Sequence, residues 1–410
     1  MCYIFLAKRT SSNGIEKYPK LRFDGYNNPW MTRKLGDLGT FIKGAPLSKA
    51  DISDRGTPFI LYGELYTTYS EVTHSVKRKT DKMVEQQFYS KIGDVIMPTS
   101  GETPEDIATA SCIMLPDVIL AGDLLIYRTE QIDGRFVSYA IKNKVNKQIS
   151  SIAQGKSVVH IRANEISKIC ITFPCLDEQK KILDLLELLD KRITTQQSLI
   201  ETLKKYKRGV INKLINEILQ EGTPQNFSDL VTIQRGGSPR PIDDYITDDA
   251  DGINWIKIGD VSADSLYITK TKERIKPFGA KKSRKVCPGD LILSNSMSFG
   301  RPYIMKIDGC IHDGWLLIRD KEGLFDKKFL CYYLASDNVM AQYRRFAAGS
   351  CVSNLNSDLV GNLQIVLPSI EQQKKSASIF EQFDLYVINA TKKYELLCEF
   401  KQGLLQQLFI

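Results

Sequence analysis

The residues best suited to binding chemistry in this chain are cations, and the largest group of them lies in one stretch. Residues 268–285 read ITKTKERIKPFGAKKSRK and contain a single acid, Glu273. A run of this kind neutralises phosphates and gives affinity for nucleic acid that depends on salt and not on sequence. Its candidate DNA contacts are Lys270, Lys272, Lys276, Lys281, Lys282, Arg284 and Lys285. The alternative is a solvated hairpin. Against it, the run has almost no balancing acids and includes Pro277-Phe278-Gly279, a turn that would present the cations.

Further arginines stand in polar loops rich in Gly, Ser and Pro. Arg235 and Arg240 lie in QRGGSPRP, and Arg301 lies in NSMSFGRP. An arginine can pair bidentately with guanine in the major groove, so these three are candidate base contacts. The first half of the chain offers fewer cations in comparable places. They are Lys43, beside a glycine, and the run Lys77, Arg78 and Lys79.

Motifs for catalysis are missing from the sequence. There is no Gly-x-x-x-x-Gly-Lys-[Ser/Thr] loop for ATP, no Gly-rich fingerprint for a nucleotide or S-adenosylmethionine, and no Asn-Pro-Pro-aromatic motif of amino-methyltransferases. Pro116-Asp117 lacks the downstream Glu-x-Lys of a metal nuclease. His312-Asp313, next to a glycine, fits a turn better than a catalytic dyad. We therefore expect a non-catalytic chain that binds no cofactor.

Metal and disulfide chemistry are not indicated either. The nine cysteines are scattered without a Cys-x-x-Cys pair, and the three histidines, at 74, 160 and 312, are far apart. This spacing does not predict a zinc site, and it is typical of reduced thiols in a cytoplasmic protein. No apolar run approaches the ~20 residues that span a bilayer. The net charge of +8 favours a polyanionic partner.

The elements that must position these side chains include a long helix over residues 177–219. Apolar residues recur there with the heptad spacing of a coiled coil: Leu186, Leu189, Ile193, Ile200, Leu203, Val210 and Leu214. At ~1.5 Å per residue, this helix is roughly 60 Å long and needs a partner along its length. Pro174 precedes it, and acids occupy its first turn, where the helix dipole favours them.

The C-terminus repeats this pattern at an offset of 194 residues. The entry Pro174-x-x-Asp-Glu-Gln-Lys-Lys matches Pro368-x-x-Glu-Gln-Gln-Lys-Lys, and Lys207, which interrupts the apolar series, matches Lys401. The apolar positions then coincide without a gap: Phe380, Phe383, Val387, Tyr394, Leu397, Leu404 and Leu408. The alternative is two unrelated amphipathic helices. Because register and interruption are both shared, we predict an internal repeat whose two helices pair with each other.

The segments before the two helices repeat as well. Gly93-Asp94 matches Gly289-Asp290, and Phe136-x-x-Tyr139 matches Phe329-x-x-Tyr332, whereas the loops between such anchors share almost nothing. Loops on a common framework carry specificity, so the two segments are expected to bind two different targets. The first is expected to contain a helix at 135–153 and short strands. Those strands are predicted at 59–62, 94–97, 118–120, 124–127 and 169–173.

The chain resembles the specificity subunit of type I restriction-modification enzymes over residues 18–410. The resemblance is carried by the lead YPKLRFDGY at 18–26, the two Pro-x-x-[Asp/Glu]-x-Gln-Lys-Lys entries and the tandem domain–helix layout. It implies an α+β chain of two mixed α/β target recognition domains, each followed by a long helix, with the helices paired as an antiparallel coiled coil. The expected parts are a loose tail (1–17), domain 1 (18–173), helix 1 (174–220), domain 2 (221–367) and helix 2 (368–410).

The resemblance also implies function and partners. Each domain would read half of a split, asymmetric site in double-stranded DNA, and the helices would carry two methyltransferase subunits. Restriction/translocase subunits would join them, and S-adenosylmethionine and ATP would bind those partners and not this chain. Two other functions remain open on the residues alone. One is a stand-alone two-domain DNA-binding regulator without a methyltransferase partner, and the other is a self-contained methyltransferase or nuclease with degenerate motifs.

Overall fold

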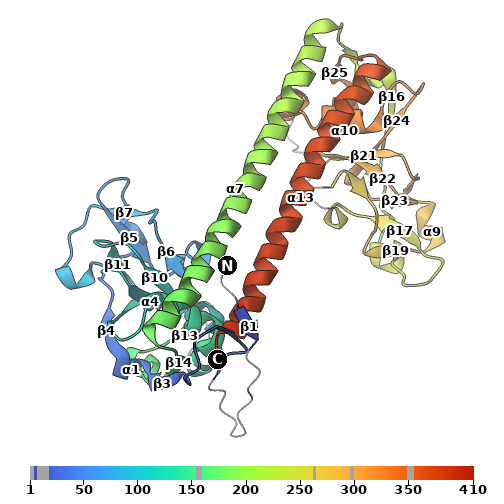
Figure 1. Ribbon diagram of the computed structural model, residues 1–410. Helices are drawn as coiled ribbons and strands as arrows, with labels where there is room; N and C mark the ends of the chain where they lie inside the picture. The colour runs from blue at the N-terminus through green and yellow to red at the C-terminus, as the bar shows by residue number, and fades with distance from the viewer. Residues whose placement is uncertain (1–3, 7–17, 154–158, 262–264, 296–299, 349–354) are drawn as a thin grey trace. The chain divides into compact units, whose positions relative to one another are not determined.

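The computed structural model describes residues 4–6, 18–153, 159–261, 265–295, 300–348 and 355–410. The chain divides into two compact units: unit 1 is Met1–Thr195 with Tyr394–Ile410, and unit 2 is Gln196–Lys393. Each unit contains one globular domain together with part of each long helix (Figure 1). None of the helices in the described ranges is long and apolar enough to cross a membrane.

The globular domain of unit 1 is built on a five-stranded sheet with the order β4-β12-β8-β10-β6 and a smaller sheet with the order β11-β5-β7. Its strands are β1 (Ile4–Leu6), β2 (Leu21–Phe23), β3 (Met31–Lys34), β4 (Gly39–Lys43), β5 (Thr57–Leu61), β6 (Val72–Thr73), β7 (Lys79–Thr80), β8 (Asp94–Pro98), β9 (Ser100–Gly101), β10 (Ser111–Ile113), β11 (Ile119–Ala121), β12 (Leu124–Thr129), β13 (Val159–His160) and β14 (Cys170–Phe173). The five strands expected from the sequence are therefore present, with ends displaced by at most two residues.

The helices of this domain are mostly single turns. They are α1 (Leu35–Leu38), α2 (Glu64–Thr67), α3 (Pro104–Ile107), α4 (Gly134–Ala140), α5 (Asn146–Ile152) and α6 (Ala163–Ile166), with 3-10 turns at Lys49–Asp51 and Gln86–Phe88. The helix expected at 135–153 is three consecutive helical segments, because a π-helical turn, Ile141–Val145, separates α4 from α5. Asp133 caps α4 by accepting a hydrogen bond from the backbone N–H of Arg135.

The N-terminal lead is tied into unit 1, which corrects the expectation of a loose tail at Ile4–Leu6. Those residues form β1 and pair antiparallel with β2, since the short run of β-favouring residues meets a strand with a free edge. The rest of 1–17 lies outside the described residues. In β2, the guanidinium of Arg22 donates to both carboxylate oxygens of Glu178, at 2.7 and 2.8 Å, and both side chains are buried. This pair joins the lead to the start of the first long helix.

The globular domain of unit 2 repeats the plan with a five-stranded sheet, β16-β24-β21-β22-β18, and a four-stranded sheet, β19-β17-β23-β20. Its strands are β15 (Gln225–Asn226), β16 (Val231–Arg235), β17 (Ile253–Ile256), β18 (Tyr267–Ile268), β19 (Glu273–Ile275), β20 (Arg284–Val286), β21 (Leu291–Ser294), β22 (Pro302–Met305), β23 (Gly309–Ile311), β24 (Trp315–Asp320) and β25 (Gln364–Ile365). Its helices are α8 (Phe227–Leu230), α9 (Pro277–Ala280), α10 (Lys327–Leu334), α11 (Asp337–Ala348) and α12 (Ser357–Gly361), with 3-10 turns at Ile242–Asp244 and Ile258–Asp260.

The same ion pair braces the five-stranded sheet in both domains. In unit 1, Arg128 on β12 contacts Asp94 at the start of β8, with Nη2 and Oδ2 3.0 Å apart. In unit 2, Arg319 on β24 contacts Asp290 just before β21, with the corresponding atoms 2.6 Å apart. These two aspartates are the ones matched in the repeated Gly-Asp anchors. The anchors thus mark the framework that the two domains share.

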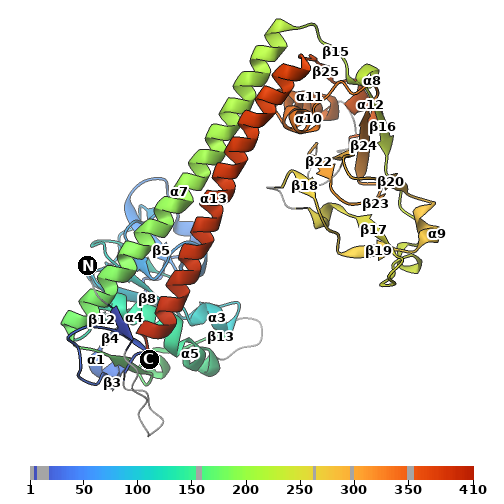
Figure 2. The ribbon, with the colours of Figure 1, turned by 45° about the vertical axis from the view of Figure 1, so that its right-hand side comes forward.

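The long helices are α7 (Leu176–Glu221) and α13 (Ile370–Leu408), and they pair antiparallel. In unit 1, Leu186 and Leu189 near the start of α7 share a core with Leu404 and Leu408 at the end of α13. In unit 2, Phe380 near the start of α13 shares a core with residues from the other end of α7, including Val210 and Leu214. Figure 2 shows the two helices running alongside each other. The coiled-coil fold expected from the sequence is present.

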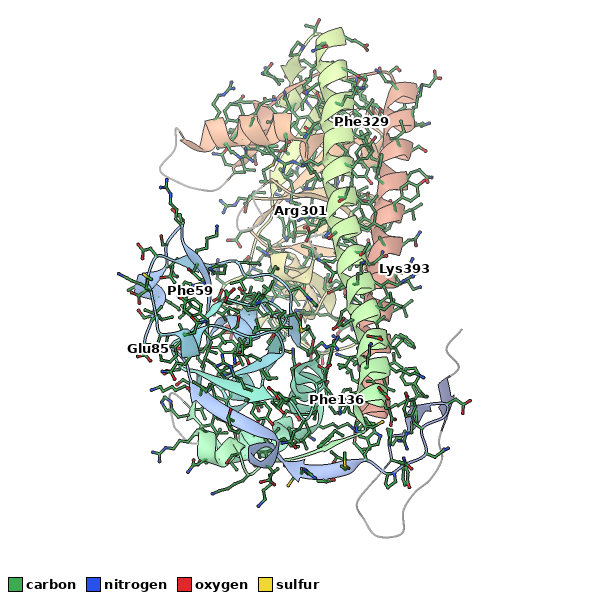
Figure 3. The ribbon with its side chains drawn as sticks, turned by 60° about the vertical axis from the view of Figure 1, so that its left-hand side comes forward. Phe59, Glu85, Phe136, Arg301, Phe329 and Lys393 are labelled. Carbon is green, nitrogen blue, oxygen red and sulfur yellow. The ribbon has the colours of Figure 1, made fainter. Side chains whose placement is uncertain are left out.

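The residues named for the pairing seam are all at least half-buried. The buried ones are Leu186, Leu189, Ile200, Phe380, Val387, Leu404 and Leu408, and the half-buried ones are Ile193, Leu203, Val210, Leu214, Phe383, Tyr394 and Leu397. One short helix of each domain covers the seam. Phe136 of α4 lies 4.8 Å from Phe409 between ring centroids in unit 1, and Phe329 of α10 joins the core that contains Phe380 in unit 2 (Figure 3).

The glutamine in each Pro-x-x-[Asp/Glu]-x-Gln entry is fully buried and joins three segments. Gln179 donates from Nε2 to the carbonyl of Pro174 at 2.8 Å and accepts at Oε1 from the backbone N–H of Asp133 at 2.9 Å. Gln373 makes the same two contacts, with the carbonyl of Pro368 at 3.0 Å and the N–H of Asp326 at 2.8 Å. Since Asp133 and Asp326 cap α4 and α10, the motif fixes each short helix to the start of a long one.

Candidate nucleic-acid interface

The basic run of unit 2 is spread over two edges of one sheet, and not over a hairpin. Its strands, β19 and β20, pair with β17 and β23 respectively and not with each other. Pro277-Phe278-Gly279 lies in the short helix α9 that connects them, not in a tight turn. The hairpin alternative is therefore wrong, because long-range pairing of each strand separates the two arms. All seven candidate cations of the run are exposed: Lys270, Lys272, Lys276, Lys281, Lys282, Arg284 and Lys285.

Some of these cations are positioned by neighbours from the preceding loop. Lys276 Nζ donates to the carbonyl of Asp244 at 2.9 Å, and Lys282 Nζ donates to the hydroxyl of Tyr245 at 2.7 Å. The one acid of the run, Glu273, forms an ion pair with Lys257. The negative charge of Glu273 is thus compensated from outside the run. The exposed charged side chains within the run are cations, which suit a polyanion, and the exposed acids Asp243 and Asp244 lie in the segment that contacts Lys276 and Lys282.

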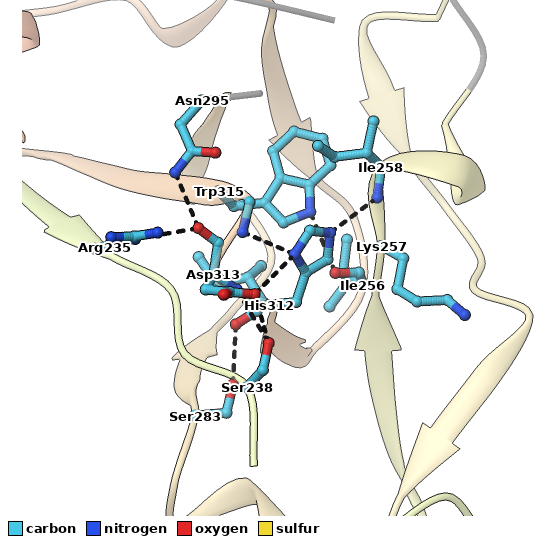
Figure 4. Close-up of polar contacts among 12 residues, drawn as sticks. Arg235, Ser238, Ile256, Lys257, Ile258, Ser283, Asn295, His312, Asp313 and Trp315 are labelled. Carbon is cyan, nitrogen blue, oxygen red and sulfur yellow. Dashed lines mark hydrogen bonds and ion pairs between the residues drawn. The ribbon is translucent and has the colours of Figure 1, made fainter. Parts of the chain in front are cut away.

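Two of the three candidate arginines of unit 2 contact Asp313. Arg235, the last residue of β16, donates from Nε to the backbone carbonyl of Asp313 at 3.2 Å (Figure 4). Arg240 Nη2 lies 3.4 Å from the Asp313 carboxylate. Asn295, which is buried, donates to the same carbonyl at 2.9 Å. Arg301 contacts a different residue: its guanidinium lies 5.9 Å from the ring centroid of Tyr303.

Asp313 is held as a carboxylate by its surroundings. The hydroxyl of Ser238 donates to Oδ1 at 2.7 Å, and this hydrogen bond is the main reason why the pKa of Asp313 lies below its ordinary value. Both partners of the Arg240–Asp313 pair are more than one-third exposed, so water screens the attraction. The pair therefore orients Arg240 without binding it tightly. Its guanidinium can exchange the carboxylate for a DNA phosphate or base.

His312 is a structural residue and does not form a catalytic dyad with Asp313. The backbone N–H of Gly314 points at Nδ1 at 2.7 Å, and that of Ile258 points at Nε2 at 3.2 Å. Burial lowers the pKa of His312, and the attraction of Asp313 offsets this only in part. In a hydrolytic triad the serine hydroxyl would face the imidazole, but here Ser238 donates directly to Asp313. His312 joins two loops across the base of the candidate interface.

Unit 1 distributes its candidate cations over different sheets. Lys43 is exposed at the end of β4 in the five-stranded sheet, whereas Lys79 is exposed on β7 in the smaller one. Lys77 is exposed just before β7. Arg78 is half-buried and pairs through Nε with Glu64 Oε1 at 3.0 Å, so part of its charge is used within the domain. These residues do not gather at a common carboxylate as Arg235 and Arg240 do.

Metal ligation and thiol chemistry find little support in the side-chain arrangement. Among the described residues, no three His, Cys, Asp or Glu side chains come together as a metal site. The cysteines that the structure describes are free thiols. Burial raises the pKa of Cys310 above its ordinary value, which disfavours a reactive thiolate beside the basic run. The chemistry available at this surface is therefore binding by cations and amides.

Comparison with known proteins decides the family. A family model described as the type I restriction modification DNA specificity domain matches the chain twice, at residues 27–205 and 225–397. The chain belongs to this family. It is a DNA-recognition subunit of a type I restriction-modification system, and the family is distinct from the catalytic subunits. The two matches also agree with the internal repeat read from the sequence.

Individual relatives of the specificity family are distant but extend over nearly the whole chain. The type I restriction enzyme MjaVIII specificity subunit of Methanocaldococcus jannaschii is 23% identical over an alignment of 410 positions, which covers 92% of this chain and 92% of the relative. The S subunit from M. genitalium aligns over 96% of this chain and 99% of its own with a TM-score of 0.57 and 17% identity. A chain from a structure of type I R-M complex assembly aligns over 94% and 99%, with a TM-score of 0.62 and 18% identity. These two structural likenesses concern the fold.

Lys207 and Lys401, the two lysines that interrupt the apolar seam, each belong to a network of polar contacts in this specificity subunit. The sequence patterns did not predict these networks. Lys401 Nζ on α13 lies 2.6 Å from Asp190 on α7, and Asp190 also accepts a hydrogen bond from the hydroxyl of Tyr139 on α4. In unit 2, Lys207 on α7 pairs with Asp384 on α13. Each network thus ties together a lysine and an aspartate from opposite long helices and a tyrosine from the globular domain.

The second network is completed by Tyr332 of α10, which donates to Asp384. Signals for both networks were present in the sequence. Asp190 and Asp384 are separated by the same 194 residues as Lys207 and Lys401, and the two tyrosines belong to the repeated Phe-x-x-Tyr anchors. What the sequence did not show is that these separate matches meet in space.

Proposed function

We propose that this specificity subunit reads an asymmetric, two-part site in double-stranded DNA, with one half-site for each globular domain. The observation that carries the proposal is one framework bearing two different sets of loops. Both domains share the strand order of the five-stranded sheet, the Arg–Asp brace and the Lys–Asp–Tyr network. The loops differ: unit 2 gathers Arg235 and Arg240 at Asp313, whereas unit 1 has Arg78 paired with Glu64. Unlike loops are expected to select unlike sequences.

The cations of unit 2 are the proposed contacts to its half-site. Lys270, Lys272, Lys276, Lys281, Lys282, Arg284 and Lys285 would hold phosphates, since they are exposed and the one acid of their run, Glu273, pairs with Lys257 outside it. Arg235, Arg240 and Arg301 would approach base edges, because Arg235 ends β16, Arg240 lies in the loop that follows this strand, and Arg301 lies between β21 and β22. Lys43, Lys77, Arg78 and Lys79 are the corresponding proposals for unit 1.

The long helices would separate the two domains and carry the partner subunits. Two methyltransferase subunits would bind, each placed on an adenine of one half-site, and restriction/translocase subunits would join for cleavage of unmethylated DNA. S-adenosylmethionine and ATP would be bound by those partners. A relative over 92% of both chains is named as the specificity subunit of a restriction enzyme, which supports this assembly. We place the complex in the cytoplasm, where its DNA substrate is found.

The function is tested by mapping methylated bases. The gene is expressed with and without its methyltransferase partner in a host that lacks other modification, and methyladenine is mapped by single-molecule sequencing. We expect a gapped two-part motif that needs both proteins. Methylation by this chain alone, or a continuous palindromic motif, would contradict the proposal.

An exchange experiment tests the assignment of half-sites. Replacing residues 227–367 by those of a relative should change one half of the methylated motif and leave the other half and the gap unchanged. The matched exchange of residues 18–173 should change only the other half. If either exchange altered both halves, the two domains would not be independent readers.

A further inference from the structure

Both globular domains present a large apolar side chain to solvent from the segment that follows an edge strand of the smaller sheet, β7 in unit 1 and β19 in unit 2. In unit 1 this residue is Met83, whose surface is 93% exposed, and in unit 2 it is Phe278, which is 63% exposed. Exposed apolar residues are ordinary when they are scattered. These two are not scattered, because they occupy the same place in the repeated framework.

Strand pairing establishes this equivalence. In unit 1, Thr80 of β7 pairs with Thr57, the first residue of β5. In unit 2, Ile275 of β19 pairs with Ile253, the first residue of β17. Met83 and Phe278 each lie three residues beyond the paired position, Thr80 or Ile275. The two loops share almost no sequence, so the common feature is the apolar character of this one position.

The ring of Phe278 is held in place by its neighbours. It stacks on Tyr245 with an interplanar angle of 14° and 6.2 Å between ring centroids. Lys282 Nζ lies 5.1 Å from the Tyr245 centroid and 5.5 Å from that of Phe278. Gly279 permits the close approach, because a Cβ there would lie 2.8 Å from the Tyr245 ring. Phe278 is therefore oriented before any ligand binds, and more than half of its surface remains open to solvent.

The surroundings of Phe278 indicate the chemistry of its partner. Lys276, Lys281, Lys282 and Arg284 flank it in sequence and are all exposed. An apolar protein surface would leave these cations without counter-charges, whereas duplex DNA offers phosphates on either side of a groove lined by bases. Apolar side chains, Phe and Met among them, can enter DNA grooves, packing against thymine methyl groups or between base steps.

The loop of Met83 has a smaller excess of positive charge. Lys79 and Lys82 precede the residue and are exposed, but the exposed acids Asp81 and Glu85 lie in the same segment. The attraction of this loop for phosphate is consequently weaker than that of the Phe278 loop. The framework position and the exposed apolar side chain are what the two loops have in common.

We propose that Phe278 and Met83 are apolar contacts to the bases of duplex DNA, one in each half-site, each placed between phosphates bound by flanking cations. This inference rests on the proposed function. The cations attract any polyanion, but an apolar side chain contributes only where it reaches bases. Phe278 and Met83 therefore act on the sequence-dependent part of binding, and the flanking lysines act on the salt-dependent part.

The test uses the full-length chain in complex with its methyltransferase partner and a duplex that carries the mapped site. Phe278→Ala and Met83→Ala are each expected to weaken binding about tenfold, the scale of removing one apolar or stacking contact to a base. The slope of log affinity against log salt should not change, because every cation that binds a phosphate is still present.

Scrambled duplexes assign each residue to its half-site. With the half-site of unit 2 scrambled, Phe278→Ala should have no further effect, whereas Met83→Ala should keep its full effect. Scrambling the half-site of unit 1 should give the reverse. Phe278→Leu and Met83→Leu should bind within about threefold of the wild type, since both keep an apolar side chain. Ile92→Ala, which removes an equally open apolar residue (62% exposed) from the turn before β8, is the matched control and should bind as the wild type does.

The failure of this inference can be told apart from failure of the proposed function. If the wild-type complex shows no gapped site, the function itself is wrong. If the wild type reads such a site and both alanine variants bind it with wild-type affinity, the apolar contacts are wrong and the function stands. A loss of affinity with a flatter salt slope, or a loss independent of which half-site is scrambled, would also overturn the inference.

Discussion

The ammonium group of Lys401 lies 2.6 Å from the carboxylate of Asp190 and 3.2 Å from that of Glu71, so one cation of α13 faces two acids in unit 1. Burial by itself lowers the pKa of Lys401, but the two carboxylates outweigh it and hold the pKa above its ordinary value. The equivalent Lys207 in unit 2 pairs with one carboxylate, that of Asp384. Both copies of the repeat thus place a lysine–aspartate ion pair in the apolar seam, and in unit 1 the lysine contacts a second carboxylate, that of Glu71.

Replacing Lys401 by Met should therefore destabilise unit 1. Glu71, whose side chain is 9% exposed, then keeps Lys142 as its one ion-pair partner among the described residues. Removing one member of a buried ion pair costs about 3–5 kcal/mol, and the partial exposure of Asp190 lowers our expectation to about 2–3 kcal/mol. Lys207→Met should cost only about 1 kcal/mol, because its pair is more exposed. Urea unfolding of both variants measures the difference.

A double-mutant cycle separates the ion pair from the loss of the lysine stem. Asp190→Asn should cost less in the Lys401→Met background than in the wild type, because the charge partner is already absent. Equal costs of Asp190→Asn in both backgrounds would show that the Lys401–Asp190 pair does not contribute to stability.

The stability of the chain should depend on His312 in mildly acidic solution. Burial lowers the folded-state pKa of His312 below its ordinary 6.5, so protons bind more readily to the unfolded chain. The free energy of unfolding therefore falls as the pH decreases below about 6.5, and it levels off below the folded-state pKa of His312. His312→Asn should remove this part of the pH dependence. Urea melts at pH 7.5, 6.5 and 5.5 measure it.

His74, which is exposed, provides the control for that measurement. His74→Asn should keep the wild-type dependence on pH. If His312→Asn also kept it, the buried imidazole would not be the titrating group.

Neutralising the basic run should flatten the salt dependence of DNA binding. In the triple variant Lys281→Gln, Arg284→Gln and Lys285→Gln, the slope of log affinity against log salt should fall by about one for each phosphate that the variant no longer binds. Lys282 is left unchanged because it supports the stack of Tyr245 and Phe278. Lys213→Gln on α7, where the side chain is 78% exposed, is the control and should not alter the slope. An unaltered slope in the triple variant would identify the run as solvated surface.

Lengthening both long helices should change the gap of the recognised site and not its half-sites. One heptad inserted into α7 and one into α13 keep the apolar seam in register and add about 10 Å to each helix. DNA advances 3.4 Å per base pair, so the gap should lengthen by about one to three base pairs. Methylation mapping reads the outcome. An unchanged gap in a folded, active variant would mean that the helices do not set the spacing.

The sequence by itself determined the parts of the molecule that depend on local spacing. Heptad positions such as Leu186 and Phe380 indicated two long helices, and the shared offset of 194 residues indicated that they pair. The entries with Gln179 and Gln373 marked where each helix begins. These features are readable because helix periodicity and capping depend on residues within a turn or two of each other.

Only the tertiary structure decided how distant residues meet. The basic run was expected to form either a phosphate-binding surface or a hairpin, and sheet pairing placed its strands β19 and β20 on two different partners. Lys401, Asp190 and Tyr139 were separate matches in the sequence, and packing of α4 on both long helices brings them together. The side chains of exposed charged residues are not positioned by packing in a core. Their neighbours depend on which strands pair over long distances in the sequence, and no local pattern specifies that pairing. The shared anchors therefore revealed the common framework, but the contacts of its loops required the fold.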